Sequence, residues 1–375
     1  MLDIGKYKGK PVTTNDDNLK NRHIAVIGES GSGKTVECQR LICSAVKQGH
    51  TIIAFDMHGT LAGDQIFWKY KETFETYMYE IHARESGIPC NLFSPIKYRD
   101  GTFENPIDTI GALTDVVADT INAGCIQSAE LRKAFQYTYE LGNYDEMGFK
   151  AIDDALKFAG NKVAEVLREK LYFLTSHNVF VPGEKMFEEG KINIFRLSRF
   201  NLKAQETVAE MILSYLWRLA NAEQFKDKQI YIFVDECQNL PSGKNNALAQ
   251  ILSEGRKMGV NLILATQMVL QGNASAVQQR IMQCGLMLYF KPAANRVATT
   301  AKMIDARAEA EWSRLLRTLS IGEFVADGSF IVDGKVKNEA LKISAVETKG
   351  DVDEDREQIS LYQSRMRGRS KNISV

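Results

Sequence analysis

The chain has 375 residues, a formal net charge of zero, 44% hydrophobic residues and 25% charged residues. This composition excludes a disordered chain, and the length suits one large α/β domain with an insertion or two modest domains. The neutral charge argues against a surface covered by nucleic-acid-binding side chains, although it leaves room for a local basic groove.

The first elements in chain order predict a βαβ unit. Residues 1–21 are polar, and we expect a short N-terminal arm there. His23–Ile27 and Thr51–Phe55 are apolar runs typical of strands, and residues 33–49 between them have apolar positions at helical spacing. A strand, a glycine-rich turn, a helix and a second strand follow one another, so the crossover should be right-handed.

Further strands alternate with helical segments along the rest of the chain. In segment 206–225 the apolar residues share one helical face. This alternation predicts an α/β fold whose mostly parallel sheet is covered by helices on both faces, within a core domain of residues 22–345. The predicted strands are Ile192–Leu197, Ile230–Val234, Val260–Ala265 and Leu286–Phe290.

Two segments stand apart from this alternation. Residues 113–176 show a helical pattern without a convincing strand, which predicts a helical insertion in the core domain. Residues 346–375 form a charged tail that is acidic at first and basic near its end. Such a tail is either a solvated end or a contact to nucleic acid.

The scattered cysteines and histidines argue against a metal or disulfide framework. The six cysteines include no C-x-x-C pair, so we expect them to be reduced and to pack as small hydrophobes. No stretch approaches the roughly 18 apolar residues of a membrane helix, and the N-terminus lacks the apolar core of a signal peptide. We therefore expect a cytoplasmic protein without a membrane segment.

The segment GESGSGKT, residues 28–35, matches the phosphate-loop pattern G-x-x-x-x-G-K-[ST] between a predicted strand and a predicted helix. Glycines let successive backbone N–H groups point at phosphates, and the helix N-terminus adds partial positive charge. Lys34 should reach the β- and γ-phosphates, and Thr35 should offer its hydroxyl to Mg²⁺. The pattern predicts binding of ATP with Mg²⁺ by Gly28, Glu29, Ser30, Gly31, Ser32, Gly33, Lys34 and Thr35.

Two adjacent carboxylates end the strand Ile230–Val234. Asp235 and Glu236 follow it directly, at the carboxyl edge where open α/β sheets bind ligands. Asp235 fits the residue that holds Mg²⁺, and Glu236 fits the base that polarises an attacking water. A glutamate beside the Mg²⁺-holding aspartate favours hydrolysis over phosphoryl transfer to a small molecule. The alternative is an acidic strand-end turn or helix cap.

The segment EGRKMGVNLILATQ, residues 254–267, contains a buried strand with polar ends. If this strand lies between the phosphate-loop strand and the Asp235 strand, Gln267 sits near the γ-phosphate and can sense it through its amide. The alternative is a plain amide at a strand end.

With this segment the chain resembles the HerA/FtsK superfamily of DNA-translocating P-loop ATPases, which includes conjugative transfer ATPases. The resemblance covers roughly residues 22–330, and EGRKMGVNLILATQ is its most specific part. A shorter likeness to HerA follows at VQQRIMQCGLMLYFKP, residues 277–292. The matching segments are GESGSGKT (28–35), FDMHGTLAG (55–63), KINIFRLSRF (191–200), FVDECQNL (233–240) and EGRKMGVNLILATQ (254–267).

The resemblance implies a RecA-like core that assembles into a homo-oligomeric ring, with six subunits as the expected number and ATP sites at the subunit interfaces. It also implies an arginine that reaches into a neighbour's site. Arg256 is the first candidate and Arg280 the second. For Arg256 the alternative is an exposed charge or an intersubunit salt bridge.

The sequence also departs from the family pattern. HerA proteins carry a β-barrel before the phosphate loop, and the 27 residues that precede Gly28 are too few for one. The membrane anchor and winged helix of FtsK are missing as well. We therefore expect a motor reduced to its core, for which barrel-mediated docking to a nuclease partner is open.

Two further residues have balanced interpretations. His58 either lines the nucleotide or subunit interface or is a hydrogen-bonded turn residue before Gly59. Lys244, in the segment after Glu236, either faces a central channel and contacts DNA phosphates or faces solvent.

Three functions remain open at this point. The first is an ATP-driven motor that moves DNA, with duplex DNA as the expected substrate, through a ring by contacts to the phosphate backbone. The second is a conjugation- or secretion-type ATPase that acts on a protein or nucleoprotein. The third is a switch in which ATP binding assembles a ring and hydrolysis only resets it.

Overall fold

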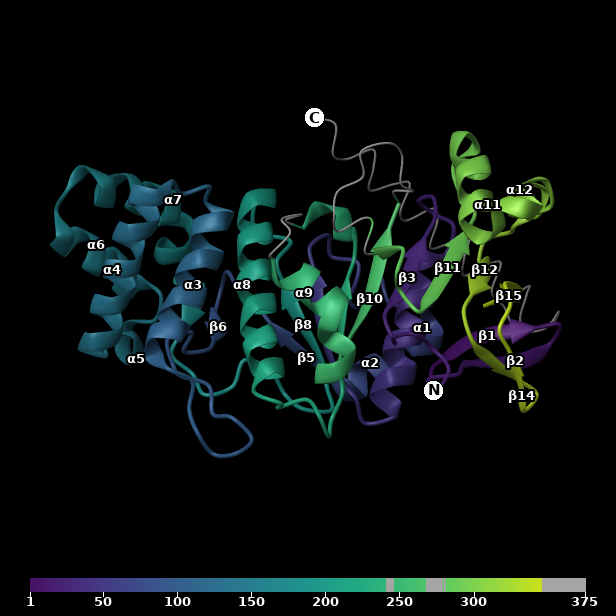
Figure 1. Ribbon diagram of the computed structural model, residues 1–375, viewed down its shortest axis with the longest axis horizontal. Helices are drawn as coiled ribbons and strands as arrows, with labels where there is room; N and C mark the ends of the chain where they lie inside the picture. Colours follow the sequence, from purple (N-terminus) through teal and green to yellow (C-terminus); the bar gives the residue numbers. More distant parts are fainter. Residues whose placement is uncertain (241–245, 268–278, 280, 346–375) are drawn as a thin grey trace.

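In the computed structural model, described here for residues 1–240, 246–267, 279 and 281–345, three regions follow one another along the long axis (Figure 1). Helices of the segment 106–176 lie at one end, a large twisted sheet with its covering helices lies in the middle, and antiparallel strands lie at the other end. Within the described ranges, every helix is too short or too polar to span a bilayer.

The described residues form a sheet of thirteen strands, in which the strands from β11 to β5 run parallel. This parallel part confirms the predicted α/β fold class. In spatial order the strands are β14 (Lys335–Lys337), β13 (Phe330–Val332), β2 (Lys10–Thr14), β1 (Asp3–Tyr7), β15 (Leu341–Ser344), β12 (Glu323–Asp327), β11 (Leu286–Phe290), β3 (Ile24–Ile27), β10 (Val260–Thr266), β9 (Ile230–Val234), β4 (Thr51–Asp56), β8 (Ile192–Arg196) and β5 (Met78–Ile81).

The N-terminal segment 1–21 was expected to be a polar arm, and this expectation is wrong. Strands β1 and β2 form a hairpin, β1 also pairs with β15, and β2 pairs with β13. Leu2, Ile4 and Val12 are buried between polar residues that face outward. The average polarity of the segment hides this alternation, and the partner strands lie more than 300 residues away in the sequence.

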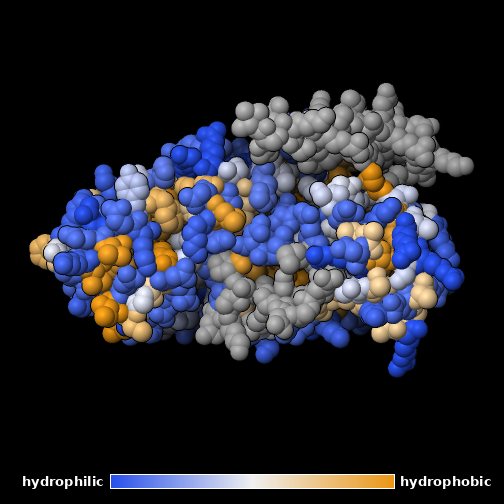
Figure 2. Space-filling view, turned by 90° about the horizontal axis from the view of Figure 1, so that it is seen from above, coloured by the Kyte–Doolittle hydropathy of each residue, from blue (hydrophilic) through white to orange (hydrophobic). Residues whose placement is uncertain are grey.

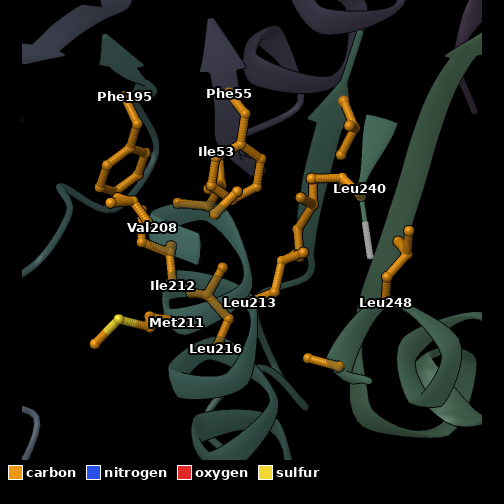
Figure 3. Close-up of a cluster of buried hydrophobic side chains, with 14 of the residues drawn as sticks. Ile53, Phe55, Phe195, Val208, Met211, Ile212, Leu213, Leu216, Leu240 and Leu248 are labelled. Atoms are coloured by element: carbon orange, nitrogen blue, oxygen red, sulfur yellow. The ribbon is translucent and has the colours of Figure 1, made fainter. Parts of the chain in front are cut away.

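Helices cover both faces of the parallel strands. The residues of β4 alternate, with Ile52 and Ala54 in the core beneath α1 (Lys34–Lys47) and α2 (Lys71–Tyr77). Ile53 and Phe55 point to the opposite core, which holds α8 (Leu202–Asn221) and α9 (Ala247–Glu254). Figure 3 shows the apolar face of α8 against these two side chains and Phe195.

Helix α8 begins at residue 202, four residues earlier than the segment 206–225 predicted, because the side chain of Asn201 accepts a hydrogen bond from the backbone N–H of Ala204 and caps the helix.

The segment predicted as a helical insertion contains five helices. They begin at Pro106 rather than at residue 113, because Asn105 caps the first helix and Pro106 occupies its first turn. Ile126, Phe158 and Tyr172 expose most of their side chains there, and Figure 2 shows hydrophobic residues gathered over this end of the molecule. The helices are α3 (Pro106–Thr120), α4 (Cys125–Leu141), α5 (Tyr144–Met147), α6 (Lys150–Ala159) and α7 (Lys162–Ser176).

Two further pairs of elements lie outside the parallel part of the sheet. Strands β6 (Ile88–Pro89) and β7 (Phe180–Val181) pair beside the insertion and join its two ends. Helices α11 (Val297–Asp305) and α12 (Glu309–Thr318) pack on each other between β11 and β12. Their position places the end of α12 close to the carboxyl end of β11 (Figure 1).

We expect Ile4→Ala to lower the free energy of unfolding by about 2–5 kcal/mol, because Ile4 is fully buried in the core under β1. Denaturant unfolding measures the loss. The same substitution at Ile126, which is 75% exposed, should change the free energy by less than about 0.5 kcal/mol. Equal effects of the two substitutions would contradict the packing of β1 in the sheet.

Candidate functional site

Three neighbouring strands end at one edge of the sheet and carry polar residues there. Strand β10 lies between β3 and β9, which is the arrangement on which the interpretation of Gln267 as a γ-phosphate sensor depended. Ile27 pairs with Thr266, and Leu264 pairs with Val234. The residues that follow these strands, Gly28, Asp235 and Gln267, therefore lie along the same edge.

The phosphate loop curls between β3 and α1. Gly31 and Gly33 have φ of 77° and 108°, which only glycine adopts without strain, and Gly33 caps α1. The Ser32 hydroxyl and the Lys34 ammonium both donate to the Glu29 carbonyl, at 2.7 and 2.9 Å. Lys34 therefore lies against the backbone of the loop at the N-terminus of α1, where an anion is favoured.

Neighbouring structure holds the loop from behind. A Cβ atom on Gly28 would lie 2.5 Å from Cβ of Phe290, at the end of β11. The backbone N–H of Gly322 donates to the Ser32 carbonyl at 3.1 Å. A hollow of about 370 Å³ opens beside the loop, between residues 29–32, Lys291 and the segment 318–321. The loop thus borders both the strand ends and an open space large enough for part of a small molecule.

Lys34 and Asp235 are both buried, and their charges face one another. Burial lowers the pKa of Lys34, and the negative charges of Glu236 and Asp235 oppose this shift. Burial raises the pKa of Asp235, and the charge of Glu236 raises it further. A hydrogen bond from Thr60 and the charges of Lys34 and His58 pull it down. Burial and the neighbouring carboxylate therefore outweigh the groups that favour the charged form of Asp235.

Glu236 is held by amides from two elements. It adopts φ of 50°, a strained conformation for a residue other than glycine, and its N–H donates to Asp235 Oδ1 at 3.0 Å. Its carboxylate accepts from Gln267 Nε2 at one oxygen and from Gln238 Nε2 at the other. The hydroxyl of Thr266 in turn donates to Gln238 Oε1 at 2.7 Å. A continuous chain of hydrogen bonds thus connects the end of β9 with the end of β10.

The oxygen donors present fit a magnesium ion bound together with phosphates. Asp235 contributes a buried carboxylate, and Thr35 contributes a hydroxyl in the first turn of α1, directly after Lys34. Hard oxygen ligands of this kind, completed by phosphate and water, are those that Mg²⁺ prefers. The adjacent carboxylates of Asp235 and Glu236 at the end of β9, together with the Thr35 hydroxyl, are the groups that favour a cation here.

Arg256, the candidate for an arginine that acts on a neighbour, does not join this constellation. It lies in the 3₁₀ turn η3 (Gly255–Met258), before β10 begins, and therefore at the opposite edge of the sheet from Gln267. Its exposed guanidinium donates to the backbone carbonyl of Lys20. A role in trans remains a prediction, and it requires a neighbour to present its phosphate loop at this edge.

Of the other predicted residues, one lies near the site and the rest lie outside the described residues. His58 is exposed, and its charge acts on Asp235. Lys244, Arg280 and the charged tail, 346–375, lie outside the described residues. Sequence reasoning missed Thr60 and Gln238. Gln238 carried a weak signal, since it is a polar residue two positions after Glu236, but only the turn η2 (Cys237–Asn239) brings it back beside the carboxylate.

Comparisons with known proteins agree with this arrangement. The family described as the central domain of the helicase HerA matches residues 2–216. The DNA double-strand break repair helicase HerA of Sulfurisphaera tokodaii is 24% identical over 299 residues, which cover 70% of this chain and 54% of that protein. The chain therefore spans about half the length of this relative.

Solved structures show the same fold. The structure of VirB4 of Thermoanaerobacter pseudethanolicus superposes with a TM-score of 0.66 at 16% identity, covering 94% of this chain and 97% of VirB4. The plasmid coupling protein TrwB in complex with ADP and Mg²⁺ gives a TM-score of 0.55 at 14% identity, covering 88% of this chain and 86% of TrwB. At these identities the likeness establishes the fold.

We expect Gly28→Ala to lower the free energy of unfolding by about 1–3 kcal/mol, because the added methyl group would push Phe290 and β11 away from the loop. Gly63→Ala is the matched control, since a Cβ atom there would have open space around it. It should change stability by at most about 1 kcal/mol. Denaturant unfolding of the two variants compares them, and equal stabilities would contradict the close approach at Gly28.

Proposed function

Since the chain belongs to the family of the HerA helicase central domain, we propose that it is a ring-forming ATPase that moves DNA. The observation that carries the ATPase part is the convergence of the phosphate loop, the Asp235–Glu236 pair and Gln267 on one sheet edge. Phosphate binding, cation binding and a carboxylate base are the parts that hydrolysis of a nucleoside triphosphate requires.

In this proposal the backbone of residues 28–35 binds the phosphates, and Lys34 places its charge at the β- and γ-phosphates. The hollow beside the loop offers space for the rest of the nucleotide. Thr35 and Asp235 would hold Mg²⁺, which neutralises phosphate charge when bound. Glu236 accepts a proton from the attacking water, and Gln267 contacts the water or the γ-phosphate.

DNA as the substrate is supported by the family and by the relative's name, a DNA double-strand break repair helicase. Because the chain spans about half of that relative, we extend this activity to it as a proposal. Contacts to the phosphate backbone would make binding insensitive to base sequence and sensitive to salt. We propose a homo-oligomeric ring of six subunits with duplex DNA in its channel.

The likeness to VirB4 over nearly the whole length of both chains keeps a conjugation- or secretion-type ATPase as the second candidate. DNA dependence of the ATPase rate separates the two candidates. We expect duplex DNA to raise the rate at low salt, and raised salt to remove the increase because it screens the phosphate contacts. A rate that is equal with and without DNA would favour the second candidate.

We expect Glu236→Gln to lower kcat for ATP roughly 100- to 10,000-fold while nucleotide binding is retained, because the amide removes the base and keeps the shape. Steady-state hydrolysis and equilibrium binding of an ATP analogue measure the two properties. Glu165→Gln, on the exposed surface of α7, is the matched control and should hydrolyse ATP like the original chain. A nearly normal kcat for Glu236→Gln would remove this residue from the reaction. If the variant instead stays assembled on ATP and a partner's activity persists, the chain is an assembly switch.

We expect Arg256→Ala to abolish turnover but spare nucleotide binding, because its charge would act on a phosphate bound by the neighbouring subunit. Native mass measurement with an ATP analogue shows whether the ring still forms. Arg132→Ala, on the exposed surface of α4, serves as the control. Unchanged turnover would remove Arg256 from the site, and a monomer under all conditions would contradict the ring.

A further inference from the structure

We infer that Gln238 is a positioning residue that couples the strand β10 to the carboxylate of Glu236. This inference rests on the proposed ATPase function and adds to it a residue that the phosphate-loop pattern and the acidic pair do not include. The amide of Gln238 lies between two groups of the site. Its Nε2 donates to Glu236 Oε2 at 2.5 Å, and its Oε1 accepts from Thr266 Oγ1 at 2.7 Å.

The chemistry of the three groups permits one orientation of this amide. A carboxylate only accepts hydrogen bonds, so Glu236 must face the NH₂ group of Gln238. The carbonyl oxygen of Gln238 must then face Thr266, whose hydroxyl is able to donate. A flipped amide would place two oxygen acceptors against one another. The two hydrogen bonds therefore depend on each other, and together they direct the Glu236 carboxylate relative to Thr266.

Thr266 is a buried residue in a paired strand, and it anchors the side chain of Gln238. It is 3% exposed, and its strand is paired along one side with β3 and along the other with β9. Thr266 itself pairs with Ile27, the last residue before the phosphate loop. The Thr266–Gln238 contact therefore holds the Glu236 carboxylate in position relative to β3 and β10, and β3 leads directly into the loop that is proposed to bind the phosphates.

The two amides that hold Glu236 differ in what they can do during turnover. Gln267 follows β10 and is exposed. In the proposed function its amide contacts the γ-phosphate or the attacking water. If Gln267 turns to that phosphate, it leaves Glu236 Oε1 available to accept a proton from water. Gln238 is half-buried and keeps its contacts to Oε2 and Thr266, so it holds the carboxylate in orientation while the water reacts.

The experiment measures kcat and KM for ATP in a set of full-length variants. Gln238→Ala removes both contacts, and Gln238→Glu keeps the size and the acceptor but removes the donor to Glu236. Thr266→Val removes the hydroxyl with little change in shape, and Thr266→Ser keeps it. Gln136→Ala, on the exposed surface of α4, is the matched control for loss of a glutamine side chain.

We expect both Gln238 variants to lower kcat roughly 10- to 100-fold while KM changes less than about twofold, because misplacement of a reacting group slows the reaction and not nucleotide binding. Thr266→Val should lower kcat in the same direction, and Thr266→Ser should restore most of it. Adding Thr266→Val to Gln238→Ala should cause little further loss, since both substitutions break one connected contact.

One result contradicts the proposed function, and different results contradict the positioning role of Gln238. If the original chain does not hydrolyse ATP, the proposed function falls. If it does hydrolyse ATP and the Gln238 variants match it in kcat, the inference is overturned. A rise in KM at unchanged kcat, or fully additive losses in the double variant, would overturn it too. Thermal unfolding of each variant separates a catalytic loss from an unfolded protein, and the nearly isosteric Thr266→Val tests the coupling even if a Gln238 variant does not fold.

Discussion

The parallel pairing of β10 between β3 and β9 is the constraint on which the site depends. Parallel strands in register end at one edge, so the residues that follow them lie close together once the sheet has formed. Strand β9 pairs with Val260–Leu264 and β3 pairs with Ile263–Thr266, so pairing supports β10 from its first residue to Thr266, directly before Gln267. A shift of one residue in either pairing would turn the side chains of β10 to the opposite face of the sheet.

Burial gives the charges of the site their effect. Lys34 and Asp235 leave water when the chain folds, so each charge is costly alone and is supported by the other. Glu236 places a second carboxylate beside Asp235, and its charge raises the pKa of Asp235 further. The sheet edge at the phosphate loop therefore favours two kinds of ligand: the loop favours an anion, and the adjacent carboxylates favour a cation. A phosphate carrying a divalent ion satisfies both.

Much of this arrangement could be predicted from the sequence, because its signals are local. GESGSGKT, Asp235–Glu236 and the apolar run before Gln267 each lie within one short segment, whereas the order of β3, β10 and β9 was only a condition that the structure has now met. The antiparallel strands could not be predicted in this way. Residues 1–21 read as polar because the hairpin buries only a few apolar side chains, and its pairing with β13 and β15 is not encoded near it. The Gln238 contact was missed because it depends on the side-chain direction in a tight turn.

The interleaving of the first and last strands has a consequence for synthesis of the protein. β1 and β2 are made before the other described elements, yet their outer partners, β15 and β13, are among the last described elements to be made. A lone hairpin is marginally stable in water, so β1 and β2 lack lasting partners until β13 and β15 have been translated. The segment 318–322, which backs the phosphate loop through Gly322, emerges late as well. The phosphate loop thus gains this support only after Gly322 has been made, and a product truncated before that residue would carry the phosphate-loop sequence without the support behind it.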